Sequence, residues 1–291
     1  EPHAKRSKKS TFVPTSDIVD ALRKEGFVPF LATQMRSRQN PKHSKHMIRF
    51  RNENDDQAKD YSHELVLVNS HDGTSPYVLY AGIYRKASDT GLIVGDLVPN
   101  IKVRHNKDPI KDILEAASRL QDMFSVVDER ITEMKAYNLE ISEIIKLAES
   151  AVEIKYQDKP RAITAAELLV SRREEDRKMD LWTIFNVVHE NMIKGGLAGT
   201  ATTNPDRTMK TKPIRNINEN VRVNVDLWNA ADSILPKAAV TEEAEQLDEV
   251  TETVAEQAET IASLKKQVRA LKRALKAFQK PQEQVKEKHA A

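Results

Sequence analysis

The chain of 291 residues contains no cysteine. This absence excludes disulfide bonds, thiolate nucleophiles and zinc or iron–sulfur sites held by cysteine. No apolar run is long enough to span a membrane, and the first residues lack the apolar stretch of a signal peptide. We therefore expect a cytoplasmic protein that has no membrane partner.

Charge is plentiful but unevenly placed. Charged residues make up 31% of the chain and hydrophobic residues 39%, which is polar for a single globular core and predicts an extended or solvated part. Residues 1–51 contain 12 lysines and arginines against four acidic residues, although the net charge of the whole chain is only +2. This basic front end favours a phosphate-bearing partner, with an ordinary solvated surface as the alternative.

The first hundred residues predict a sheet. Residues 1–15 are expected to form a flexible basic tail, followed by a short helix that Ser16 caps and Gly26 ends. Residues 47–51 then alternate apolar and basic side chains, as a half-buried strand does. Further strands are expected at residues 65–68, 77–84, 92–94 and 101–104, separated by turn residues. This order is typical of an antiparallel β-meander.

The next part of the chain predicts helices. They are expected after the Asp108 cap, over residues 139–154, after the capping box that begins at Thr164, and over residues 181–192 before Gly195 and Gly196. Residues 197–215 predict a loop, and a last core helix ends at Pro236. The fold class is therefore α+β, an antiparallel β-meander packed with several helices in a core domain over residues 16–236. Residues 237–291 are expected to form a linker, a C-terminal coiled-coil helix and a tail.

A heptad pattern over about residues 242–280 predicts that coiled coil. Nine of its ten core positions are apolar across five heptads, and the tenth is Gln257. The predicted oligomerisation residues are Leu247, Val250, Val254, Ile261, Leu264, Val268, Leu271, Leu275 and Phe278. Acidic residues fill the first half of the segment and basic residues the second, which favours antiparallel pairing in a homo-oligomer. A single helix lying along its own domain is the alternative.

Two basic clusters are candidate contacts for nucleic-acid phosphates. The first comprises Arg36, Arg38, Lys42, Lys45, Arg49 and Arg51. The second comprises Arg207, Lys210, Lys212 and Arg215. Aromatic residues near the predicted strands either stack on bases or form the core, namely Phe50, Tyr61, Tyr77, Tyr80 and Tyr84.

No motif predicts a catalytic site. His189-Glu190 resembles the start of a zinc-protease motif, but Ile193 stands where the second histidine is needed. The glycine-rich residues 195–200 follow a helix end and lack the Lys-Ser/Thr pair of a phosphate-binding loop. We therefore predict no catalytic residue, no metal and no cofactor, and the sequence favours a non-enzymatic protein over an enzyme.

Several segments together resemble a known family. They lie at residues 27–30, 46–51, 67–73, 82–85, 91–96, 103–105, 181–186, 190–196 and 223–228. These segments are similar to the phage/plasmid-like family called domain of unknown function 932. The sequence departs from that family at Ser88-Asp89-Thr90, and the heptad segment lies outside the resemblance.

The resemblance implies a protein of phage, plasmid or bacterial genomes, acting in the cytoplasm of a bacterial host cell, with no established activity. That context favours DNA metabolism, and the element order is also similar to the core of phage single-strand annealing proteins. The leading prediction is a non-enzymatic protein that binds single-stranded DNA, or anneals it, in recombination or replication. The alternatives are a factor that binds a host protein through its coiled coil, and a nucleic-acid-modifying enzyme.

Overall fold

The computed structural model describes residues 13–35, 44–53, 55–70, 76–104, 108–157, 163–201 and 204–236, together with Val268. The chain divides into two units, Glu1–Leu235 and Pro236–Ala291. Apart from Val268, which is helical and 48% exposed, the predicted coiled-coil residues lie outside the described residues. Among the described residues, no helix is long and apolar enough to cross a membrane.

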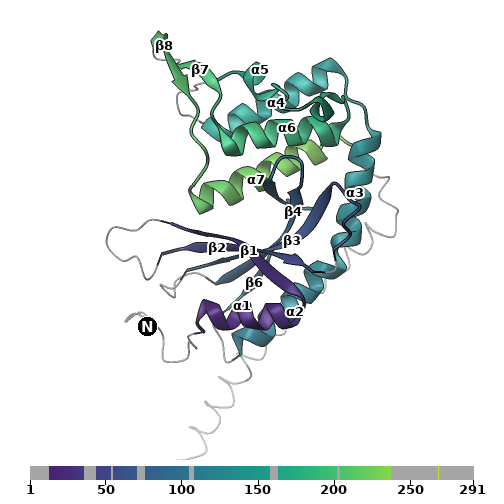
Figure 1. The fold of residues 1–291 in the computed structure, drawn as a ribbon, viewed down its shortest axis with the longest axis vertical. Helices are drawn as coiled ribbons and strands as arrows, with labels where there is room; N and C mark the ends of the chain where they lie inside the picture. The colour runs from purple at the N-terminus through teal and green to yellow at the C-terminus, as the bar shows by residue number, and fades with distance from the viewer. Residues whose placement is uncertain are drawn as a thin grey trace, which may run out of the picture. The chain divides into compact units, whose positions relative to one another are not determined.

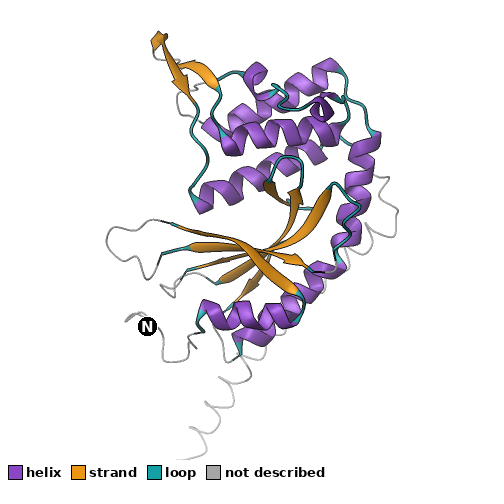
Figure 2. Ribbon diagram, in the orientation of Figure 1, coloured by secondary structure: helices purple, strands orange, loops and turns teal. Residues whose placement is uncertain are grey.

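A curled antiparallel sheet forms the centre of the first unit, as the meander predicted (Figure 2). Its strands are β1 (Phe27–Gln34), β2 (His46–Asn52), β3 (Tyr61–Asn69), β4 (Tyr77–Arg85), β5 (Thr90–Ile93) and β6 (Ile101–Val103). Strands β1 to β5 pair in sequence order. The last strand, β6, pairs with the first half of β4, because β5 takes only the second half of β4.

Helices α1 (Thr15–Lys24) and α2 (Pro109–Asp122) lie on one side of this sheet (Figure 1). Alternate side chains of β2 to β4, such as Phe50, Leu65 and Leu79, point into this layer and are fully buried. This alternation follows from the two-residue period of a strand, which sends successive side chains to opposite faces. The strand side chains on this face of the sheet therefore belong to the larger of the two hydrophobic clusters.

The other side of the sheet is covered by a helical layer, with α7 nearest to the strands (Figure 1). The layer comprises α4 (Ile141–Tyr156), α5 (Ala165–Leu168), α6 (Leu181–Lys194) and α7 (Ile217–Asp232), with the 3-10 helix η2 (Glu174–Arg177). Helix α3 (Phe124–Ala136) connects the two layers along the edge of the molecule. Ile217 of α7 packs against Met47, Val66 and Ile93 of the sheet, so both faces of the strands are buried over part of their length.

The cap residues explain where the helices begin. Asp108 accepts a hydrogen bond from the Lys111 backbone at 3.2 Å, with Pro109 at the first helical position, as predicted. The predicted capping box between Thr164 and Glu167 is also present. The prediction that Ser16 caps α1 was wrong, because the helix begins at Thr15 and Pro14 occupies the N-cap position, two residues before Ser16.

Three elements differ from the sequence prediction. Strand β1 contains Pro29, which a sheet tolerates because β1 lies at the edge. The predicted loop after α6 instead contains a hairpin of β7 (Ala198–Ala201) and β8 (Asn204–Lys210). The helical pattern that begins at Pro109 breaks at Met123 and continues as α3.

Candidate functional site

A cleft of about 640 Å³ opens between the sheet and the helical layer. Strands β1 and β2 form its floor, and its walls come from the start of β5, the end of α6 and the segment that leads into α7. Six large apolar side chains line it: Leu31, Met35, Met47, Ile193, Ile214 and Ile217. The volume lies within the range of about 300–1,000 Å³ that ligand pockets span.

The charged lining of this cleft is mainly basic. Lys194 and Arg215 line the walls and Arg49 the floor, while Asp89 is the acidic residue of the lining. The carboxylate of Asp89 accepts a short hydrogen bond from the Tyr84 hydroxyl. The first turn of the 16-residue helix α7 also lines the cleft, and its helix dipole adds partial positive charge there.

Lys194 is held in place by a polar network that continues through Glu190 to Arg173. Its ammonium group donates to the Ser88 carbonyl at 2.5 Å and to Glu190 at 3.1 Å. Glu190 is also paired with Arg173 through two bonds of 2.8 Å. Burial raises the pKa of Glu190, but the hydrogen bonds from Arg173 and Lys194 outweigh burial and hold the pKa below its ordinary value.

One residue from each predicted basic cluster lies near the start of α7. The Lys45 ammonium, at the start of β2, donates to the Asn218 side chain of α7 at 2.8 Å, across 173 positions of the sequence. Arg215 of the second cluster is exposed and lines the cleft only three residues from Asn218. Lys210 and Lys212 are exposed on the segment between β8 and the cleft.

The other predicted contacts are placed differently. Arg36, Arg38 and Lys42 lie outside the described residues, and the side chain of Arg207 in β8 is not described. Arg49 is only 3% exposed, contrary to the expectation of a solvent-facing phosphate contact. Its guanidinium donates to Glu64 at 2.6 Å and to the carbonyls of Gly91 and Leu92, so it is committed inside the protein.

Arg51 is also engaged, but nearer the surface. Its guanidinium carbon lies 3.4 Å from the ring centre of Phe30 and 3.5 Å from that of Tyr84. Its Nε donates to Glu64 at 3.4 Å, and 30% of the side chain remains exposed. The predicted aromatic residues Phe50, Tyr61 and Tyr77 are buried in the core.

Sequence reasoning missed Lys194 and Asp89. Lys194 immediately precedes Gly195 and Gly196, which are the helix stop and belong to the motif shared with the resembling family. Its place within that segment was a signal that could have identified it. Asp89 adopts a positive φ of 48° in the turn before β5, and the only signal for it was the departure from the family at Ser88-Asp89-Thr90.

His189 is buried in the helical layer and does not reach the cleft. It is fully enclosed, and its Nε2 lies 2.9 Å from the Asn224 side chain. Burial lowers the pKa of His189 to about 4, and the hydrogen bond that its imidazole donates to the Asn224 amide oxygen opposes this in part. The imidazole is therefore a neutral packing group near pH 7. Among the described residues, no three His, Asp or Glu side chains form a group that could hold a metal.

This buried histidine predicts a specific acid sensitivity. Because its pKa is lower in the folded than in the unfolded state, His189 contributes full stability above pH 6.5 and loses it as the pH falls towards 4. We expect the stability difference between wild type and His189→Gln to shrink by about 1.4 kcal/mol per pH unit across that window. Urea unfolding at pH 7.5, 6 and 5 measures this difference. If the free energies of unfolding of the two proteins changed equally with pH, the lowered pKa of His189 would be contradicted.

Comparisons with known proteins place this fold among uncharacterised relatives. Residues 2–228 match the family described as Domain of unknown function (DUF932). The chain is 34% identical to the UPF0380 protein YfjQ and 33% identical to the UPF0380 protein YafZ, both of Escherichia coli K12. Each alignment covers 81% of this chain and 86% of the relative. No solved structure matches.

Proposed function

Because the chain belongs to the family Domain of unknown function (DUF932), whose name states no activity, we propose a function from the cleft itself. The protein binds a single strand of nucleic acid there, with DNA as the preferred strand, and acts without catalysis. The observation that carries this proposal is that Lys194 and Arg215 line one cleft, while Lys45 is bonded to Asn218 in the first turn of α7, whose neighbours Ile217 and Asn220 line that cleft. Phosphates are the ligands that such a group of cations suits best.

The apolar lining favours a strand with unpaired bases. Leu31 and Met35 on one side and Ile193 and Ile214 on the other offer surfaces for the faces of bases, and Lys194 and Arg215 line the same cleft. A flexible single strand can enter a cleft of about 640 Å³, whereas a duplex keeps its bases stacked and would meet only the rim. Binding by backbone charge with base-face contacts is typical of proteins that take single strands with little sequence preference.

Fluorescence anisotropy with single- and double-stranded oligonucleotides of equal length, at two salt concentrations, tests this proposal. We expect tighter binding of the single strand and a steep loss of affinity with salt. Replacing Arg215 with alanine should weaken binding about tenfold and reduce the logarithmic salt slope by about 0.7, the share of one phosphate on a single strand.

The matched control is Arg23→Ala, because Arg23 is exposed on α1, in the layer on the opposite side of the sheet. This variant should bind as the wild type does. Absence of binding at low salt would reject the proposed function. Equal losses for Arg23→Ala and Arg215→Ala would reject the cleft as the site.

A further inference from the structure

Two neighbouring apolar side chains are exposed on the edge strand β1. Phe30 is 38% exposed and Leu31 46% exposed. In a regular strand they would point to opposite faces, but the pairing of β1 with β2 shifts register between Pro29 and Leu31. Such bulges redirect side chains and are frequent beside functional sites. The bulge therefore explains why the Phe30 ring is exposed, next to Leu31 of the cleft, and is not buried in the core.

The Phe30 ring is held rigidly by its neighbours. The Arg51 guanidinium lies between the rings of Phe30 and Tyr84, and Glu64 balances its charge from the buried side. Tyr84 in turn donates its hydroxyl to Asp89, which lines the cleft. A guanidinium over an aromatic face is attracted to the ring electrons. The ring is consequently oriented before any ligand arrives, which lowers the entropy cost of binding.

The stack is continuous with the cleft on both sides. Leu31, directly after Phe30, lines the floor of the cleft, and Asp89 at the far end of the stack lines its wall. An exposed aromatic ring beside a basic cleft has the two components of a single-strand site, a base platform and a phosphate track. A protein partner would also cover an apolar ring, but the basic rim of the cleft favours an anionic chain that carries flat apolar groups.

We infer that Phe30 is the platform on which an unpaired base stacks while the adjoining phosphates lie along the basic side of the cleft. This inference rests on the proposed function. It adds the Phe30 ring as the group that distinguishes a single strand from any other polyanion. Arg51 acts as a positioning residue, because its guanidinium lies against the rings of Phe30 and Tyr84.

Oligonucleotides with and without bases test the inference. A thymidine oligonucleotide and an abasic strand of the same length carry the same phosphates, so only the first can stack. Phe30→Leu keeps an apolar side chain but removes the ring, and Phe30→Tyr keeps the ring as the matched control. We expect Phe30→Leu to weaken binding of the thymidine strand about tenfold, to leave binding of the abasic strand unchanged, and Phe30→Tyr to bind both as wild type does.

The outcomes separate the two proposals. If wild type binds neither strand at low salt, the proposed function fails and the stacking inference fails with it. If wild type binds both strands and Phe30→Leu weakens neither, or weakens both equally, the stacking inference is overturned and the proposed function stands. A Phe30→Trp variant gives a second measurement, because both native tryptophans, Trp182 and Trp228, are buried. The fluorescence of the tryptophan at position 30 should be quenched by the thymidine strand and not by the abasic strand. Equal quenching by the two strands would overturn the inference.

Discussion

Replacing Arg49 with methionine is expected to lower the free energy of unfolding by about 3–5 kcal/mol, the loss typical of breaking a buried ion pair. Arg49 and Glu64 are 3% and 0% exposed in their side chains, and the ion-pair distance is 2.6 Å. Burial raises the pKa of Glu64, and the guanidinium groups of Arg49 and Arg51 act against that rise. Without Arg49, the Glu64 carboxylate would keep its desolvation penalty and lose its main partner.

The surroundings of Arg49 are shaped to this side chain. Its guanidinium also donates to the carbonyls of Leu92 and Gly91 at 3.1 and 3.0 Å. A Cβ atom at position 91 would lie 2.2 Å from Arg49 Nη1, so glycine is required there for the guanidinium to fit. Methionine can fill much of the volume but satisfies neither carbonyl, so hydrogen bonds are lost together with the ion pair.

Urea unfolding of three variants measures this effect. Arg23→Met is the control for a surface arginine and should change stability by less than about 0.5 kcal/mol. The double variant Arg49→Met/Glu64→Leu should recover part of the loss, because it removes the buried charge as well as its partner. A stable Arg49→Met protein that had lost only oligonucleotide binding would instead return Arg49 to the set of phosphate contacts.

Arg49 also shows what an alternating pattern can and cannot predict. Residues 47–51 correctly predicted a strand, and Ile48 and Phe50 face the core as expected. The alternating pattern implied that the basic side chains of this strand are exposed to solvent. Near Arg49, however, β5 and the helices α6 and α7 cover the face of the sheet that carries them. The partner, Glu64, lies on the next strand, where pairing sets it opposite Arg51. The buried ion pair of Arg49 and Glu64 is therefore visible only once the strand register and the helical layer over the sheet are known.

The sequence correctly predicted those helix ends that depend only on residues close to them in the chain. The Asp108 cap, the capping box at Thr164 and the glycines after α6 all act within a few residues. Strand β1 was missed because its order depends on pairing with β2, and Pro29 argues against a strand in the absence of an edge. The hairpin of β7 and β8 likewise depends on pairing between its own strands.

The candidate site was predicted only in part, for the same reason. Both basic clusters were visible in the sequence, but the bond from Lys45 to Asn218, which lies three residues after Arg215, joins segments 173 positions apart. The i,i+4 spacing of Glu190 and Lys194 was visible in the sequence, but the contact of Lys194 with the Ser88 carbonyl, 106 positions away, was not. Residue type thus led to the proposed ligand chemistry, and the fold decides which of these residues lie near the cleft.

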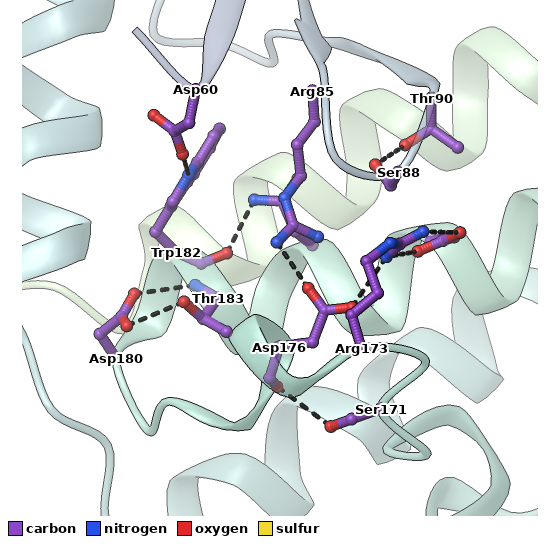
Figure 3. Close-up of polar contacts among 12 residues, drawn as sticks. Asp60, Arg85, Ser88, Thr90, Ser171, Arg173, Asp176, Asp180, Trp182 and Thr183 are labelled. Atoms are coloured by element: carbon purple, nitrogen blue, oxygen red, sulfur yellow. Dashed lines mark hydrogen bonds and ion pairs between the residues drawn. The ribbon is translucent and has the colours of Figure 1, made fainter.

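Replacing Asp176 with alanine is expected to cost a similar amount, about 3–5 kcal/mol, because it leaves a buried arginine without its partner. Asp176 is 1% exposed and accepts from Arg85 at 2.6 Å and from Arg173 at 2.8 Å (Figure 3). Arg85 is 6% exposed, and its Nη1 already has no hydrogen-bond partner among the described residues. The matched control is Glu174→Ala, which removes an 82% exposed carboxylate from the same 3-10 helix and should change stability by less than about 1 kcal/mol.

The two variants also test whether this network positions the cleft. Arg173 joins Asp176 to Glu190, and Glu190 joins Lys194, so losing Asp176 should loosen the lysine at the wall. In conditions where Asp176→Ala is still folded by circular dichroism, its affinity for a single strand should therefore fall, while Glu174→Ala binds normally. Equal unfolding midpoints for the two variants would show that Asp176 contributes no more than a surface carboxylate. A destabilised Asp176→Ala protein with unchanged affinity would show that Lys194 is held by Ser88 and Glu190 alone.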